Sequence, residues 1–176
     1  MIDYLVLIVR MPNNLNGREV KYQYSMNIAI PLTSYNPNNI FLCDTVKNTV
    51  MDNSTFTRVL FSNSFVTLVG LHFQLCIKGT RDDFYFQKVR TIFKVEENEE
   101  MINIVEKIEN NLLSMIRCGK RRITKLSDQL RNGVLRSATH ACWDSTGPFF
   151  VLKITGIWET EREYGITYKV TDANRR

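Results

Sequence analysis

Residues 149–170 decide the fold of this chain and read FFVLKITGIWETEREYGITYKV. Two runs rich in β-branched and aromatic residues flank the charged segment ETERE, a pattern typical of a β-hairpin. Apolar and polar residues alternate in both runs, so each strand should turn one face to a core and the other to solvent. The sequence therefore predicts a hairpin whose two faces differ in chemistry.

The two faces of this hairpin can be assigned from the alternation. The core face is predicted to contain Leu152, Ile154, Ile166, Tyr168 and Val170. The opposite face is predicted to contain Lys153, Thr155, Thr167 and Lys169. Simple alternation would also place Trp158 on the core side, but Trp158 follows Gly156 at the rim, where it could cap the core or stack on a base.

Three more strands are predicted upstream of the hairpin. The first covers residues 55–61, and the second covers 65–78, where the odd positions suit a core and Gly70 marks a bend. The third covers residues 84–95, FYFQKVRTIFKV. Its odd positions are predicted to face the core, and its even positions form the other face: Phe84, Phe86, Lys88, Arg90, Ile92 and Lys94.

A helix is predicted over residues 99–117, where the apolar period changes from two to about 3.6. Asn98 suits the N-cap position and Gly119 suits the end of the helix. Its apolar stripe is predicted to contain Met101, Ile104, Val105, Ile108, Leu112, Met115 and Ile116. A second helical segment is predicted over 122–132, ending at Gly133, and residues 134–147 are predicted to form a loop.

The order of these elements predicts an α+β domain made mainly of antiparallel strands. Residues 54–170 follow the order of an OB-like five-stranded barrel, with one long helix between the third and fourth strands. Residues 1–50 read as an N-terminal β extension, with strands over 2–9 and 19–30 and a loop over 34–39. The whole chain, 1–176, is expected to form a single domain.

The composition fits a globular protein, with 44% hydrophobic and 23% charged residues. A net charge of +5 favours an anionic partner. The first ten residues are apolar, but they lack the length of a membrane span and the layout of a secretion signal. We therefore expect an intracellular protein that is neither secreted nor bound to a membrane.

Enzymatic signatures are absent from the sequence. The chain holds two histidines, and neither lies in a recognisable nucleophile or metal motif. Its four cysteines are scattered, without the close pair that anchors most zinc sites. We expect no catalytic residues, no metal and no cofactor.

Aromatic and basic residues instead point to nucleic acid. The even face of strand 84–95 presents two aromatic rings followed by cations, and single-stranded nucleic acid binds to such surfaces by base stacking and phosphate contact. Phe84 and Phe86 could equally pack beneath a loop of the N-terminal extension. Lys153 and Lys169 would extend the cationic surface, and a further basic cluster contains Lys120, Arg121, Arg122 and Lys125.

Three segments carry a resemblance to a known family. They are STFTRVLFSNSFVTLVGLHFQL (54–75), the pattern L-x-x-Q-L-x-x-G (126–133), and FVLKITGIWETEREYGITYKV (150–170). In this order they resemble single-stranded-DNA-binding proteins of large double-stranded-DNA viruses and related mobile elements. The resemblance implies an OB-type fold that coats single-stranded DNA during replication or recombination, in the host nucleus or at a viral replication site.

The sequence thus predicts a non-enzymatic, viral single-stranded-DNA-binding protein. Its expected partner is single-stranded DNA, with RNA and self-association into a homo-oligomer left open. Its expected contacts are the cations and aromatic residues named above, with Trp158 as a further stacking candidate. The alternative is a β-rich virion or self-assembling interaction protein without a nucleic-acid function.

Overall fold

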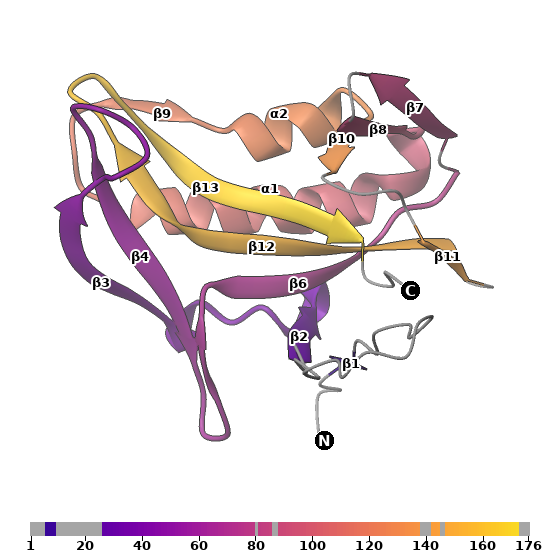
Figure 1. Ribbon diagram of the computed structural model, residues 1–176, viewed down its shortest axis with the longest axis horizontal. Coiled ribbons are helices and arrows are strands. Elements are labelled where there is room, and N and C mark those ends of the chain that lie inside the picture. Colours follow the sequence, from indigo (N-terminus) through magenta and orange to yellow (C-terminus); the bar gives the residue numbers. More distant parts are fainter. Residues whose placement is uncertain are drawn as a thin grey trace, which may run out of the picture.

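The computed structural model describes residues 6–9, 26–79, 81–85, 88–137, 142–144 and 147–172. Its main layer is a strongly curled sheet, against which the long helix α1 (Glu99–Ser114) and the short helix α2 (Lys125–Arg131) pack (Figure 1). A separate three-stranded sheet lies at one end. The predicted α+β class, mostly strands with one long helix, is confirmed.

Strand β12 (Gly147–Glu159) organises the main sheet. Along one edge it pairs antiparallel with β13 (Glu163–Asp172), which confirms the predicted C-terminal hairpin. Along the other edge, its first half pairs with β6 (Leu71–Cys76) and its second half pairs with β4 (Thr55–Ser62). The two halves of β12 therefore have different neighbours, and the sheet must curl where the neighbour changes.

The remaining strands of this sheet extend from β12, β4 and β6. β4 also pairs with β3 (Ile40–Lys47) and β5 (Thr67–Val69), whereas β6 pairs in parallel with β2 (Met26–Pro31). β1 (Val6–Val9) pairs with β2, β11 (Cys142–Asp144) with β12, and β9 (Arg121–Ile123) with β13. The main sheet thus has ten strands among the described residues, where the sequence predicted a barrel of five.

Gly70 divides the predicted strand 65–78 into β5 and β6, which confirms the expected bend. It has a φ of 88°, and a Cβ at this position would lie 2.7 Å from the carbonyl oxygen of Ile154. Beyond the bend, Leu71, Phe73, Leu75 and Ile77 are buried, as predicted. Before it, Phe65 is 93% exposed and Val69 55% exposed, because the chain there forms the β4–β5 turn and an outer strand.

A second glycine allows β4 to approach β12 closely. A Cβ on Gly156 would lie 2.4 Å from the ring of Phe56 and 2.5 Å from the carbonyl oxygen of Thr57. Just before Gly156, the pairing between β12 and β13 shifts by one residue, so that Ile154 pairs with Tyr168 but Gly156 pairs with Thr167. Such a bulge reverses the alternation of faces in the strand that contains it.

This reversal corrects the expected position of Trp158. Of the two neighbouring residues Ile157 and Trp158, Ile157 is the one buried in the core, at 1% exposed. Trp158 lies on the opposite face of β12, which is also the face of Lys153. Simple alternation failed here because it takes no account of the extra residue at the bulge.

Helix α1 ends at Ser114, three residues earlier than predicted, and Gly119 has no part in its end. Its buried face contains Ile102, Val105, Ile108, Glu109, Leu112 and Leu113. Ile102 and Leu113 were not predicted, whereas the predicted Met101, Ile104 and Ile116 are partly buried and pack against the core. Met115 is 41% exposed because it lies beyond the helix. The centre of the buried stripe is therefore rotated from the predicted one.

Asn98 does not cap the helix with its side chain. Its buried amide accepts a hydrogen bond from the backbone N–H of Lys78 and donates to the carbonyl oxygens of Lys78 and Lys94. These three bonds join the segments that follow β6 and β8 to the start of α1. Asn98 is a tertiary crosslink, which local sequence could not distinguish from an N-cap.

The predicted single strand over 84–95 is wrong. Residues in this region form a hairpin of β7 (Arg81–Tyr85) and β8 (Lys88–Ile92), and β8 pairs on its other edge with β10 (Val134–Ser137). The segment 134–147 is therefore not simply a loop. Thr91 and Phe93 are buried as predicted, but this small sheet is separate from the sheet that contains β12.

Two further boundaries differ from the prediction. β3 falls within the predicted N-terminal extension, yet it pairs with β4 and belongs to the main sheet. The second helix, α2, begins at Lys125 because residues 121–123 pair with β13 as β9. The predicted loop 34–39 contains parts of two 3-10 turns, Leu32–Ser34 and Pro37–Asn39, and a third, Glu96–Asn98, precedes α1.

Replacing Gly156 by Ala should destabilise the protein by about 1–3 kcal/mol, because the added methyl group would push Phe56 and the β4 backbone away from β12. Gly119→Ala is the matched control, since a Cβ there meets no atom within 4 Å. Denaturant unfolding of both variants would measure the difference. Equal free energies of unfolding for the two variants would contradict the close approach at Gly156.

Candidate nucleic-acid interface

A groove of about 1060 Å³ crosses the sheet from β3 to β13 and continues to α2 and β10. At one end it is lined by the last residues of β3 and the turn that follows, up to Met51. Its middle is formed by β4 and β12, and its other end by β13, α2 and β10. The groove thus joins segments that are far apart in sequence.

An apolar row crosses four strands of this groove. In the strand registers, Val46 pairs with Phe56, Phe56 with Trp158, and Trp158 with Gly165. Paired residues on neighbouring strands are side-chain neighbours on one face of a sheet. A Cβ on Gly165 would lie 2.9 Å from the Trp158 ring, so the indole lies over this glycine. Trp158 is half-buried and lines the groove, which leaves part of its ring accessible.

Basic side chains surround the aromatic residues. Five of them line the groove: Lys47, Arg58, Lys125, Arg136 and Lys153. None of the five forms an ion pair with another described residue, and no Asp or Glu is among the described residues that line the groove. The groove therefore concentrates positive charge that no described carboxylate neutralises, beside accessible aromatic rings.

Three of the sequence-predicted contact residues come together here, namely Lys125, Lys153 and Trp158. Lys169 is exposed and pairs with Lys153 across β12 and β13, so it faces the same side just outside the groove lining. Arg90 is exposed, but it belongs to the separate three-stranded sheet. Phe84, Phe86 and Lys88 lie outside the residues whose side chains the structure describes.

The basic cluster at 120–122 is largely neutralised by the protein itself. Lys120 forms an ion pair with Glu159 at 3.0 Å, and Arg121 pairs with Glu163. Arg122 donates a hydrogen bond to the hydroxyl of Tyr164. These contacts arise because β9 runs beside β13, where the carboxylates of the hairpin turn lie.

Lys94, the last predicted cation, is also paired. Its ammonium group lies 3.1 Å from the carboxylate of Glu97. Both side chains are largely exposed, so this pair contributes little to stability. It nevertheless offsets the positive charge that the sequence suggested for this segment.

Sequence reasoning missed five of the basic and aromatic residues that line the groove. Phe56 and Arg58 share a parity in the predicted strand 55–61, so that signal was present but was not followed. Lys47 fell in the supposed N-terminal extension, and Arg136 fell in a supposed loop. Tyr168 was assigned to the core, against which it packs, but it is only half-buried and also lines the groove.

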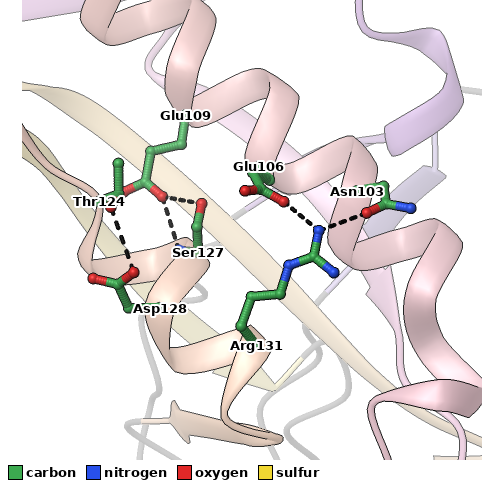
Figure 2. Close-up of polar contacts among 7 residues, drawn as sticks. All are labelled: Asn103, Glu106, Glu109, Thr124, Ser127, Asp128 and Arg131. Atoms are coloured by element: carbon green, nitrogen blue, oxygen red, sulfur yellow. Dashed lines mark hydrogen bonds and ion pairs between the residues drawn. The ribbon is translucent and has the colours of Figure 1, made fainter.

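Helix α2 is held in position by a buried carboxylate from α1. Glu109 is fully buried and accepts hydrogen bonds from the backbone N–H groups of Leu126 and Ser127, at 3.3 and 2.8 Å, and from the hydroxyl of Ser127 (Figure 2). Thr124, the N-cap residue of α2, makes no capping bond. Glu109 therefore serves as the cap from a neighbouring helix, where the helix dipole favours negative charge.

Two further contacts fix α2. At its C-terminal end, Arg131 donates to Asn103 at 2.7 Å and pairs with Glu106 (Figure 2). On the groove side, the amide of Gln129 donates to the hydroxyl of Tyr168. With both ends anchored to α1, α2 presents Lys125 and Gln129 to the groove at fixed positions.

Burial shifts the ionisation of three groups near the groove. It raises the pKa of Glu109, against the effect of the hydrogen bonds from Ser127 and Leu126. It raises the pKa of Tyr168 to about 12, with a further contribution from the charge of Glu109. It lowers the pKa of His72, which pairs with Lys153 across β6 and β12 and is repelled by its charge.

Comparison with known proteins identified no relative: no family model, curated protein or solved structure matches the chain. Within the described residues, no group of three His, Cys, Asp or Glu side chains could hold a metal ion. No described helix is long and apolar enough to cross a membrane.

Replacing Glu109 by Gln should change the pH dependence of stability. Because the folded pKa is raised above the unfolded value of ~4.3, the stability contributed by the protonated carboxyl is complete below that value and is lost as the pH rises through the folded pKa. The free energy of unfolding of the wild type should therefore fall with pH relative to that of Glu109→Gln. Denaturant titrations at several pH values would measure this, and parallel pH curves would contradict it.

Proposed function

We propose that this chain is a non-enzymatic single-stranded-DNA-binding protein that holds the strand in the groove between β3 and α2. One observation carries the proposal. The groove combines five basic side chains, none paired with a described carboxylate, with an apolar row that includes Phe56 and Trp158. Cations along the backbone and rings beneath the bases are the two features that single-strand-binding grooves combine.

The composition of the groove favours single strands over duplexes. In a duplex the bases are stacked on one another, so aromatic rings on a protein cannot reach their faces. A single strand presents both phosphates and base faces to the same surface. The half-exposed ring of Trp158 supports this preference, because a purely phosphate-binding surface would need no aromatic residue.

The finer architecture belongs to the same proposal. The curled sheet with a sharp bend at Gly70 and one long helix supports an OB-like barrel, a fold that binds oligonucleotides on a sheet face and its adjoining loops. The resemblance of residues 54–75, 126–133 and 150–170 to viral single-strand binders supports a role in coating DNA during replication or recombination. The proposed setting is a viral replication site within the host cell.

A self-assembling virion or interaction protein is the second candidate. It is favoured by large apolar side chains that face solvent, including Phe41 at 51% exposed and Phe65 at 93% exposed. Such residues can contribute to contacts between copies of a chain. Sedimentation with and without oligonucleotide would distinguish assembly from binding.

The affinity for oligo-dT should fall steeply with salt. Each phosphate that a cation neutralises contributes a slope of about −0.7 in log K against log salt, so five contacts give roughly −3.5. Removing two groove cations, with Arg58→Gln and Lys153→Gln together, should reduce the slope by about 1.4. Oligonucleotide titrations at four salt concentrations would measure it.

The matched control removes the same charge elsewhere. Lys120→Gln with Arg121→Gln also lowers the net charge by two, but both residues are ion-paired outside the groove lining. This double variant should keep the wild-type slope. An equal loss of slope in both double variants, or tighter binding of duplex than of single strands, would indicate a general basic surface instead of a groove.

Replacing Trp158 by Leu should weaken single-strand binding by roughly 1–3 kcal/mol, the usual contribution of one stacked base. The apolar Leu side chain would still pack over Gly165, so the melting temperature of this variant should be close to that of the wild type. Trp158→Phe retains an aromatic ring and should recover most of the affinity. If the Leu and Phe variants bind equally well, Trp158 does not stack on a base.

A further inference from the structure

The turn between β3 and β4 presents apolar side chains at the mouth of the groove. Residues 48–51 all line the groove, and they include Val50, which is 94% exposed, and Met51, which is 36% exposed. Exposing such side chains to water is unfavourable. They share the groove with five cations that have no ion pair among the described residues, so a ligand that bound both would combine negative charge with apolar surface.

This turn is held by its own hydrogen bonds. The side-chain oxygen of Asn48 accepts from the backbone N–H groups of Val50 and Met51, at 2.9 and 3.4 Å. The Asn48 N–H donates to the carbonyl oxygen of Ser54, and the hydroxyl of Ser54 donates to the carbonyl oxygen of Met51. The backbone that carries the two apolar side chains is therefore held by the turn before any ligand binds.

The turn continues the apolar row of the groove. Val46, 57% exposed, is the row member on the edge strand β3, and Val50 and Met51 follow it in the chain beyond that edge. The basic residues Lys125 and Arg136 lie at the far end, on α2 and β10. Arg58 and Lys153 lie in the middle, and Lys47 lies beside the turn itself. The apolar side chains are therefore concentrated at the β3 end while the cations extend along the whole groove, which suits a strand whose phosphates follow the cations and whose bases reach the turn.

We propose that Val50 and Met51 form a base-binding rim, through which the groove distinguishes unpaired nucleobases from a bare phosphate backbone. The proposal rests on the function proposed above and adds a specificity determinant to it. The expected occupant is an unpaired base of a strand whose phosphates bind the cations. A neutral or basic protein partner is disfavoured at this position because it would leave those cations unneutralised.

A second turn provides a matched control within the same chain. Between β4 and β5, Asn63 accepts from the backbone N–H groups of Phe65 and Val66, both at 2.9 Å. Phe65 occupies the position equivalent to Val50 and is equally exposed, at 93%. This turn lies at the opposite end of β4 and does not line the groove (Figure 1).

The experiment compares two probes of equal length, oligo-dT and an abasic oligodeoxynucleotide that has the phosphates without the bases. The wild type should bind oligo-dT more tightly than the abasic probe. Val50→Ser with Met51→Ser should lose about five- to tenfold in affinity for oligo-dT, as expected for removing partly buried apolar contacts. Its affinity for the abasic probe and its salt slope should stay the same, and Phe65→Ser should bind both probes as the wild type does.

The possible outcomes distinguish a failure of the base-binding rim from a failure of single-strand binding by the groove. If the rim variant keeps the wild-type preference for oligo-dT, the rim proposal is overturned and single-strand binding stands. If the rim variant loses affinity for both probes equally, the turn only shapes the groove, and the rim proposal is again overturned. If the wild type binds neither probe, the proposed function fails first. A change in sedimentation of the rim variant without a change in binding would instead identify a second copy of the chain as the occupant.

Discussion

The groove depends on the close approach of β4 to β12 at Gly156. Any larger residue would have to displace its neighbours, because the Phe56 ring and the Thr57 carbonyl occupy the space that a Cβ would need. The same place contains the bulge that reverses the faces of β12. As a result Ile157 enters the core, while Trp158 joins Phe56 on the outer face. The glycine thus permits the close approach at the point where the bulge brings Trp158 beside Phe56.

Charge is distributed around this row by strand pairing as well as by composition. Lys120 and Arg121 lie beside the carboxylates of the β12–β13 turn and form ion pairs with them, whereas Arg58 and Lys153 lie on strands without acidic neighbours in the groove. Lys125 reaches the groove because a buried carboxylate, Glu109, holds α2 against α1. A buried carboxylate is costly, and here its hydrogen bonds to the helix start offset part of that cost.

The sequence was informative where structure is local. It predicted the C-terminal hairpin, the bend at Gly70 and the inward positions of Thr91 and Phe93, because alternation and glycine act within a few residues. It failed at 84–95, where pairing with residues 134–137 builds a separate sheet, and at Trp158, where a bulge shifts the alternation. For the candidate site it gave Lys125, Lys153 and Trp158. Arg136 and Lys47 were missed, because long-range pairing brings them to the groove.

The two turns at the ends of β4 show why local sequence cannot identify the remaining groove residues. Residues 48–51 read NTVM and residues 63–66 read NSFV, so each places two apolar residues after an asparagine and a hydroxyl residue. Each asparagine accepts the same two backbone hydrogen bonds, and each turn exposes one apolar side chain almost completely. Only the first turn lies at the groove, and that position is set by the pairing of β3 with β4 and of β4 with β12. Because hydrogen bonds already hold the backbone of such a turn, that backbone loses little freedom when a ligand covers the turn, so burial of its apolar side chain contributes more fully to affinity than it would on a flexible loop.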